Sequence, residues 1–164
     1  MTLTVGTNSY LSVADADSYW SARNDSTWSG ASTAAKEKAL IEATQYIDGS
    51  YNFIGVITDL DQSLAWPRVG AYIPSGSFKG RSYDSDEIPQ CVKDACAELA
   101  FHALSTNLVT VNDRGGAVKR QKVDVIEIEY ADNAPAQKSY DFVDMIIKPV
   151  LGGAGSSNVS LTRA

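Results

Sequence analysis

The segment Ile88–Asn107 most constrains what this chain can fold into, because its helical periodicity is clear over a long stretch. Its small and apolar residues recur at spacings of three and four, which places them on one face of a helix. Pro89 suits the first turn, Asp86 or Ser85 can cap the helix, and Asn107 can end it. Small side chains on the apolar face let another helix approach closely, so we expect this helix at the centre of a small domain. The apolar face consists of Val92, Ala95, Cys96, Leu99, Ala103 and Leu104.

Three further segments show helical patterns with plausible boundaries. Ser12 followed by Asp15 resembles an N-terminal capping arrangement, and Pro149 restricts continuation of the last helix. We expect residues 24–31, which include Trp28, to form a loop between the first two of these helices. The expected helices run from Val13 to about Arg23, from Ser32 or Thr33 to Asp48, and from Tyr140 to about Lys148.

The helical patterns also predict which side chains face solvent and which face the core. In the second of these helices the charged residues are expected on the solvated side. In the last, the apolar residues are expected to face inward. The residues expected on the solvated side are Lys36, Glu37, Lys38 and Glu42, and those expected to face inward are Phe142, Val143, Ile146 and Ile147.

The clearest β signal is KVDVIEIEYAD, residues 122–132. Its apolar residues change parity once, which is what a β-bulge near Val125–Ile126 would produce. We expect residues 118–122 to pair with part of this strand or to extend it. The sequence therefore predicts a mainly α protein: a small bundle of about four helices with a β-hairpin or bulged strand and extended termini.

Composition and charge exclude several classes of protein. The chain has 164 residues, enough for one domain with a real core, and a formal net charge of −6. Its pI of about 4.7 argues against a protein whose main task is to grip a phosphate backbone. The sequence has no apolar run near the roughly 20 residues that span a bilayer, and its N-terminus lacks a signal-peptide pattern. We therefore expect a protein of cytosolic origin that makes no membrane contact.

The sequence contains no convincing catalytic or metal-binding motif. The single histidine, His102, lies in a helical pattern without a matching nucleophile signature. Cys91 and Cys96 point away from each other on one helix, so neither an intrahelical disulfide nor a metal site with His102 is expected. Glycine pairs fit no phosphate-binding loop, and the acidic pairs at 59/61 and 84/86 supply too few ligands for a calcium loop. We predict no enzyme activity, no cofactor and no bound metal.

One local reversal of charge stands out in this acidic chain. Four basic residues lie within nine positions beside two glycines. Three interpretations remain open: a contact for DNA phosphate, a contact for an acidic protein, or a solvated strand edge protected against sheet-to-sheet pairing. This basic patch consists of Arg114, Lys119, Arg120 and Lys122.

Two segments lack periodicity and are candidate contact regions. Residues 70–85 are rich in glycine, serine and tyrosine, and we expect them to become ordered only on contact with a neighbour. Residues 152–164 follow the compact part, 1–151, as a glycine- and serine-rich tether with a β-prone tip. This tail is either an attachment arm or a frayed terminus. The contact residues expected in an arm are Val159, Ser160, Leu161, Thr162 and Arg163.

Several blocks, in this order, together carry a family resemblance that spans nearly the whole chain. They are TLTVGTNSYLSVADADSYW, EKALIEATQYID, SLAWPR, EIPQCVKDACAELA, DRGGAVKRQKVDVIEIEY and VSLTRA. The ordered set resembles a family of small tailed-phage proteins labelled DnaT-like single-stranded-DNA-binding proteins, and in function it is similar to head–tail connector (adaptor) proteins.

This resemblance implies a structural virion protein. The expected role is an adaptor, a dodecameric ring on the portal that bridges to tail or tail-completion proteins while DNA passes through the channel without specific binding. An acidic lining would repel phosphate there. The alternative function is a single-stranded-DNA-binding replication accessory protein, and a weaker third is a small metal-dependent hydrolase. The aromatics Trp20, Trp28 and Tyr46 are expected to pack between helices rather than to stack on bases.

Overall fold

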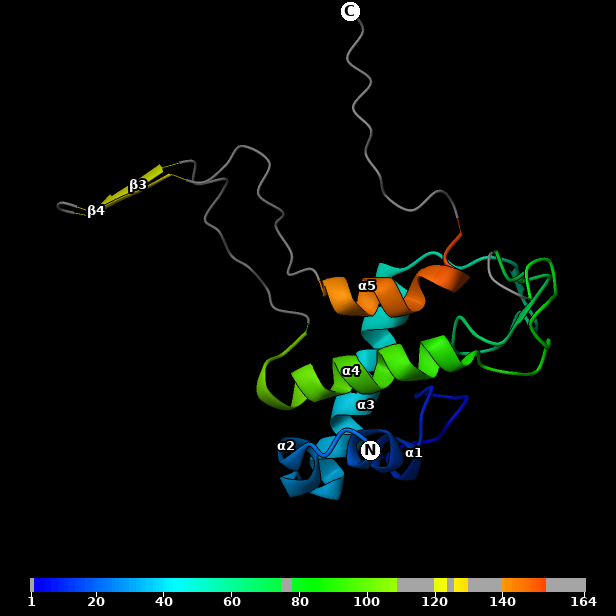
Figure 1. Cartoon of the computed structure of the whole chain (residues 1–164), viewed down its shortest axis with the longest axis horizontal. Coiled ribbons are helices and arrows are strands. Elements are labelled where there is room, and N and C mark those ends of the chain that lie inside the picture. The colour runs from blue at the N-terminus through cyan, green and yellow to red at the C-terminus, as the bar shows by residue number, and fades with distance from the viewer. Residues whose placement is uncertain (1, 75–77, 109–119, 124–125, 130–139, 153–164) are drawn as a thin grey trace, which may run out of the picture.

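The computed structural model describes residues 2–74, 78–108, 120–123, 126–129 and 140–152 (Figure 1). The described part is mainly helical with two small strand pairs, which confirms the expected fold class. The elements in chain order are α1 (Val13–Ser21), α2 (Ser26–Gly30), α3 (Thr33–Ser50), β1 (Val56–Ile57), β2 (Arg68–Val69), α4 (Gln90–Ser105), β3 (Arg120–Val123), β4 (Ile126–Glu129), α5 (Asp141–Ile147) and the 3₁₀ turn η1 (Lys148–Val150).

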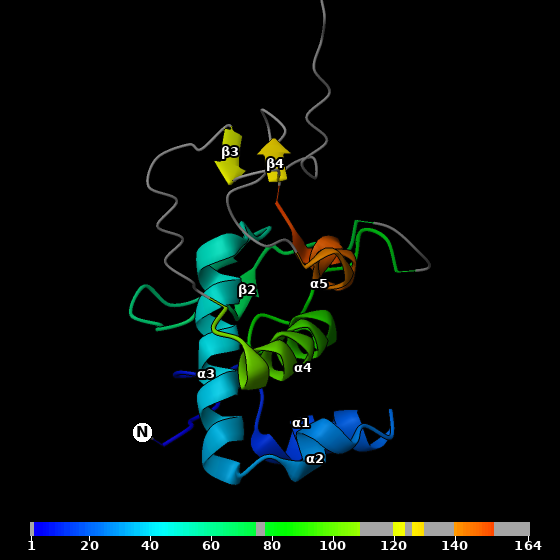
Figure 2. The same ribbon diagram turned by 90° about the vertical axis from the view of Figure 1, so that its left-hand side faces the viewer.

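The core lies where α3 crosses α4. Figures 1 and 2 show α5 alongside α4 and the short helices α1 and α2 near the first turns of α3. The apolar face predicted for α4 is confirmed at its centre, since Val92, Ala95, Cys96 and Leu99 are fully buried. Small residues on both helices allow this close crossing. The facing core residues of α3 are Ala39, Leu40, Ala43 and Ile47.

The start of α4 differs from the prediction. Pro89 is its N-cap, and no side chain caps it. The backbone carbonyl of Pro89 instead accepts from the amides of Val92 and Lys93, at 3.0 and 3.2 Å. The expected cap from Asp86 or Ser85 is wrong because α4 begins too far along the chain for either side chain to occupy the capping position.

The first three helices all have side-chain caps. The Ser12 hydroxyl accepts from the Asp15 amide at 3.1 Å, which confirms the predicted capping arrangement. Asp25 accepts from the amides of Thr27 and Trp28, at 2.7 and 3.1 Å, and so begins α2 where a loop was expected. Asp25, a residue type that is common at helix N-caps, was the sequence signal that could have predicted this helix. Its short turn buries the Trp28 ring, which is only 1% exposed.

Two side-chain predictions need correction. Lys36, expected on the solvated side of α3, is buried, and its ammonium lies 2.8 Å from the Asp17 carboxylate of α1. The ammonium also lies 5.6 Å from the centre of the Trp28 ring, so the neighbouring helices provide partners for the buried charge. Phe142, expected to face inward on α5, is 57% exposed, whereas Val143 and Ile147 fill the inward positions.

One arginine joins several parts of the segment between α3 and α4. The Arg68 guanidinium donates to the carbonyls of Ile54, Ala65 and Gly55, at 2.7, 3.1 and 2.7 Å. β1 and β2 pair antiparallel, with Val56 opposite Val69, and the Trp66–Pro67 peptide bond is cis. Sequence patterns suggested an irregular segment here because its order comes from side chain–backbone bonds rather than from periodicity.

The strands β3 and β4 form an antiparallel hairpin in which Val123 is opposite Ile126. The prediction that residues 118–122 pair with the following segment is therefore confirmed for its C-terminal part. Of the two expected forms, the antiparallel pairing of β3 with β4 agrees with the β-hairpin. The expected bulge near Val125–Ile126 involves a position outside the described residues.

At the end of the described chain, Phe53 forms an antiparallel bridge with Leu151. The Gly152 amide then donates to the Asn52 carbonyl at 2.7 Å. The first residue of the expected arm is thus bonded to the helical part. The remaining arm, including Val159 through Arg163, lies outside the described residues, so its attachment role stays a prediction.

Gly55 should be required for the β1–β2 contact. It has φ +75°, and a Cβ at this position would lie 2.5 Å from the backbone oxygen of Val69. Gly55→Ala should therefore destabilise the protein by about 2 kcal/mol or more, because it adds a backbone clash to an unfavourable dihedral. Thermal unfolding followed by circular dichroism tests this. Gly49→Ala, at a helical position with open space around it, is the control and should be neutral or slightly stabilising.

Both cysteines are free, as expected, and should be poor nucleophiles. Burial raises the pKa of the Cys96 thiol to about 12 and that of Cys91 to about 11, so little thiolate exists near neutral pH. Iodoacetamide at about pH 8 should modify neither residue in the native protein and both in denaturant. Mass spectrometry reads the outcome, and rapid native labelling of Cys96 would contradict the described packing.

Candidate functional site

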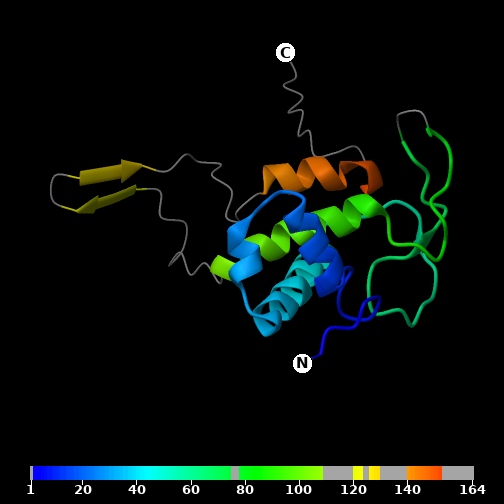
Figure 3. The same cartoon turned by 60° about the horizontal axis from the view of Figure 1, so that its bottom comes forward.

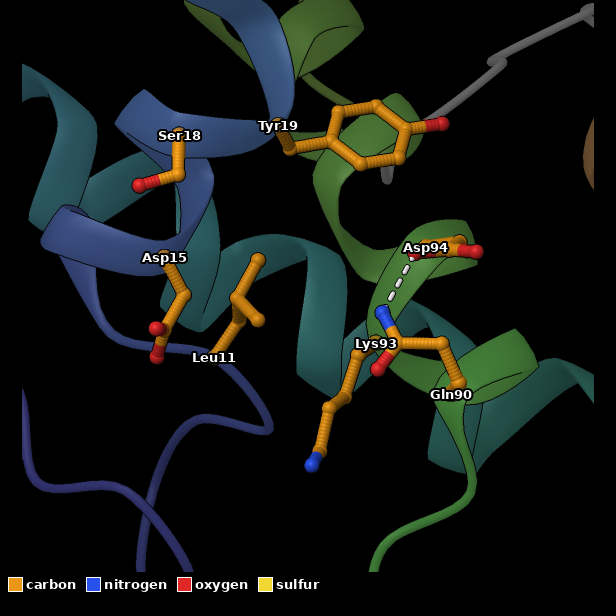
Figure 4. Close-up of a pocket in the computed structure, with 7 residues that line it drawn as sticks. All are labelled: Leu11, Asp15, Ser18, Tyr19, Gln90, Lys93 and Asp94. Carbon is orange, nitrogen blue, oxygen red and sulfur yellow. Dashed lines mark hydrogen bonds between the residues drawn. The ribbon is translucent and has the colours of Figure 1, made fainter. Parts of the chain in front are cut away.

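A groove of about 330 Å³ lies between α1 and the first turns of α4. Figure 4 shows its α1 side chains on one side and its α4 side chains on the other. Tyr19 borders the groove, and its hydroxyl donates to Glu98 at 2.7 Å, while the Arg23 guanidinium carbon lies 3.5 Å from the Tyr19 ring centre. The groove residues are Leu11, Asp15, Ser18, Tyr19, Gln90, Lys93 and Asp94.

Most polar side chains of this groove already have hydrogen-bond partners within the protein. The Gln90 amide donates to Asp94 at 2.8 Å, and the Ser12 hydroxyl donates to Asp15 at 2.6 Å as part of the α1 cap. Burial, together with the bond to Glu98, raises the pKa of Tyr19. These contacts account for the groove as a junction between helices, so we do not assign it a ligand.

A second cavity, of about 310 Å³, borders Asp48 near the end of α3. The Tyr10 hydroxyl donates to the Asp48 carboxylate, which also accepts from the Ala65 amide at 3.1 Å. Burial raises the pKa of the Asp48 carboxyl, although these two bonds oppose the shift. Asp48 thereby joins the N-terminal segment, α3 and the segment before α4, which is a structural role.

A metal site needs clustered ligands, and a membrane span needs a long apolar helix. Within these residues no three histidine, cysteine, aspartate or glutamate side chains gather in a way that could hold a metal ion. Asp59 instead accepts from the amide of Asp61 at 3.0 Å, a local turn contact. No helix in the described part of the chain is both long and apolar enough to cross a bilayer.

The basic patch is only partly described. Arg114 and Lys119 lie outside the described residues, whereas Arg120 and Lys122 belong to β3. The register places Arg120 opposite Glu129 and Lys122 opposite Glu127. This is a register of backbone positions, and all three interpretations of the basic patch stay predictions.

A different basic surface appears in the segment between β2 and α4. Residues 71–74 and 78–83 form a second hairpin-like structure, which we call the aromatic–basic hairpin. Tyr72 forms an antiparallel bridge with Ser82, and the Ile73 amide donates to the Arg81 carbonyl at 2.8 Å. Residues 70–85 were expected to become ordered only on contact with a neighbour, whereas here backbone groups of 71–74 and 78–83 pair with one another.

The aromatic–basic hairpin exposes both rings and cations. Tyr72 and Phe78 are each 59% exposed, and Lys79 and Arg81 are exposed beside them. The Arg81 guanidinium carbon lies 5.6 Å from the Phe78 ring centre. Sequence reasoning missed this surface, although a signal was present: residues 62–83 contain three basic residues and no acidic one.

The three aromatic residues predicted to pack between helices do so. Trp20 is 7% exposed, and its ring centre lies 4.7 Å from that of Phe101. Trp28 is buried, and Tyr46 is half-buried with its ring edge-to-face on Tyr140. The two tryptophan rings are therefore unavailable for stacking on bases without unfolding the helical core.

Comparison with known proteins gives one finding. No curated protein and no solved structure matches the chain. A family model does match, and it covers residues 2–164, which is nearly the whole length. The family resemblance drawn from the sequence blocks is confirmed at this level, whereas the similarity to head–tail connector proteins stays a prediction. The chain belongs to the family described as "Putative DnaT-like ssDNA binding protein".

Proposed function

We propose that this protein is a non-enzymatic binding protein whose ligand is single-stranded DNA. The observation that carries the proposal is the pairing of exposed aromatic rings with cations at Tyr72, Phe78, Lys79 and Arg81. Single-stranded nucleic acids bind through base stacking on such rings and through phosphate contacts with such cations. Membership in the family described above supports the same class of ligand.

The charge of the rest of the molecule limits how tight this binding is. Apart from Lys79 and Arg81, residues 2–108 and 140–152 contain fifteen acidic and six basic side chains, a difference of −9. Such a surface repels phosphate within a Debye length of about 8 Å at physiological salt. The proposal is therefore a weak, accessory contact with a few phosphates rather than a high-affinity groove.

The purified full chain should bind a fluorescein-labelled oligothymidine of about 16 nucleotides, a length at the upper end of typical site sizes. We expect a dissociation constant on the order of micromolar at about 0.15 M salt, weakening as salt rises, because phosphate contacts release counterions. Fluorescence anisotropy measures both quantities. Absence of binding even at low salt would overturn the proposed function.

A second candidate, the head-to-tail adaptor, is favoured by the same acidity. We propose in this case that the subunits form a ring on the portal of a tailed phage and bridge to tail proteins in the virion. The resemblance to adaptor proteins implies a ring of twelve subunits. A negative channel lining repels phosphate and so lets DNA pass without binding. Phe142 and Met145, 57% and 71% exposed on α5, supply apolar surface for neighbouring proteins.

Deletion of residues 156–164 tests the adaptor role of the tail. Co-purification with the portal should drop sharply, because the deletion removes the proposed contact residues Val159 through Arg163. The melting temperature should stay unchanged, since the described core ends before the deletion. Unchanged portal binding would show that the tail is a frayed terminus, and a large loss of stability would show that it packs on its own domain.

A further inference from the structure

We infer that the aromatic–basic hairpin is the surface that contacts single-stranded DNA, with bases stacking on Tyr72 and Phe78 and phosphates meeting Lys79 and Arg81. This inference rests on the proposed DNA-binding function and assigns it to four residues. It also separates that function from the basic patch at residues 114–122, for which a contact with DNA phosphate was one of three interpretations of the sequence.

The two rings are available in a way that other aromatics of the described surface are not. Tyr72 and Phe78 are each 59% exposed, which leaves most of each side chain in water. Phe142 is similarly exposed, at 57%, but its neighbour in the chain is the acidic Asp141 and Asp144 follows in the same helix. Carboxylates beside an exposed ring repel the phosphates of a nucleic acid, whereas cations beside such a ring attract them.

The cations are placed to act together with the rings. Arg81 lies 5.6 Å from the Phe78 ring centre, a distance at which a guanidinium and an aromatic face attract each other. Within the described residues neither Lys79 nor Arg81 forms an ion pair with a carboxylate. A guanidinium packed against a ring keeps several N–H groups free to donate, so Arg81 can bind phosphate next to a stacked base.

The hairpin holds these groups in place before any ligand binds. The Gly80 amide donates to the Ile73 carbonyl at 2.9 Å, and the Arg81 amide donates to the Phe78 carbonyl at 3.0 Å. At its base Tyr83 lies edge-to-face on the buried Trp66, with ring centres 6.0 Å apart. A surface that is ordered in advance loses less conformational entropy on binding.

The position of the hairpin in the fold also favours this assignment. Figure 3 shows the segment that carries it at one edge of the helical body, away from α1 and α2. Acidic residues Asp84, Asp86 and Glu87 follow immediately in the chain and are exposed. Phosphate is therefore attracted to the cations of the hairpin and repelled by the acidic residues that follow it.

The same chemistry selects single strands over duplexes. Bases of a single strand can present their faces to Tyr72 and Phe78, whereas those of a duplex are already stacked on one another. The two α-carbons are at most about 20 Å apart even for a fully extended chain, so a short strand can reach both. Duplex DNA would meet only the two cations and would also approach the nearby carboxylates.

The test compares variants of the full chain in the anisotropy titration. The double variant Tyr72→Ala/Phe78→Ala should weaken oligothymidine binding about tenfold or more and leave the salt slope unchanged, because it removes stacking but no charge. The double variant Lys79→Gln/Arg81→Gln should reduce the slope of log K against log salt by about 0.7 for each lost phosphate contact. Circular dichroism confirms that each variant is folded.

Matched controls make these outcomes specific. Phe142→Ala removes a ring of nearly equal exposure, and Lys38→Gln removes an exposed lysine of α3. Both should bind like the wild type. The wild type should also prefer the single strand to a duplex of the same length.

Several results would overturn the assignment. If the wild type binds but the hairpin variants bind equally well, the hairpin is not the contact although the proposed function stands. Loss of binding only in a variant with Arg114, Lys119, Arg120 and Lys122 changed to glutamine would move the contact to the basic patch. Competition by polyglutamate as effective as that by oligothymidine would identify an acidic protein as the partner. No binding by the wild type would remove the proposed function itself.

Discussion

The close crossing of α3 and α4 is the contact on which the rest of the described structure depends. At its centre the buried Thr44 hydroxyl donates to the Leu40 carbonyl and accepts from the Tyr10 amide, at 2.9 and 3.2 Å. Its oxygen also lies 3.5 Å from the Cys96 sulfur of α4. Alanine and cysteine on the facing surfaces leave room for this approach, and each large apolar side chain buried around it contributes about 1.5–3 kcal/mol. The other helices then cover the remaining faces of this pair.

Polar contacts at the end of α3 extend this core to the segment before α4. Asp48 accepts from both Tyr10 and the Ala65 amide, and Arg68 binds three backbone carbonyls nearby. Trp66 and Ala71 are fully buried, which ties the base of the aromatic–basic hairpin to the core. The core therefore supports the aromatic–basic hairpin that carries the exposed rings, so the surface proposed for DNA contact has a defined shape.

The distribution of charge links the two proposed functions. The helical part is strongly acidic, whereas residues 62–83 carry only basic charges. An acidic body suits a protein past which DNA moves, and a small basic surface at its edge suits a protein that holds a strand weakly. Because both features occur in one chain, affinity and salt dependence for single-stranded DNA distinguish the two functions better than net charge does.

The sequence by itself determined α1, α3, α4 and α5, because their apolar periodicity, the capping serines of α1 and α3 and the proline after α5 act locally. It also determined that Trp20 and Trp28 belong to the core, and its ordered blocks identified the family. Only the tertiary structure decided that Lys36 is buried, because its partners Asp17 and Trp28 belong to other helices. The aromatic–basic hairpin was likewise decided by tertiary structure. Its order depends on backbone pairing and on the contact of Tyr83 with the buried Trp66. Such contacts leave no periodic signal in the sequence.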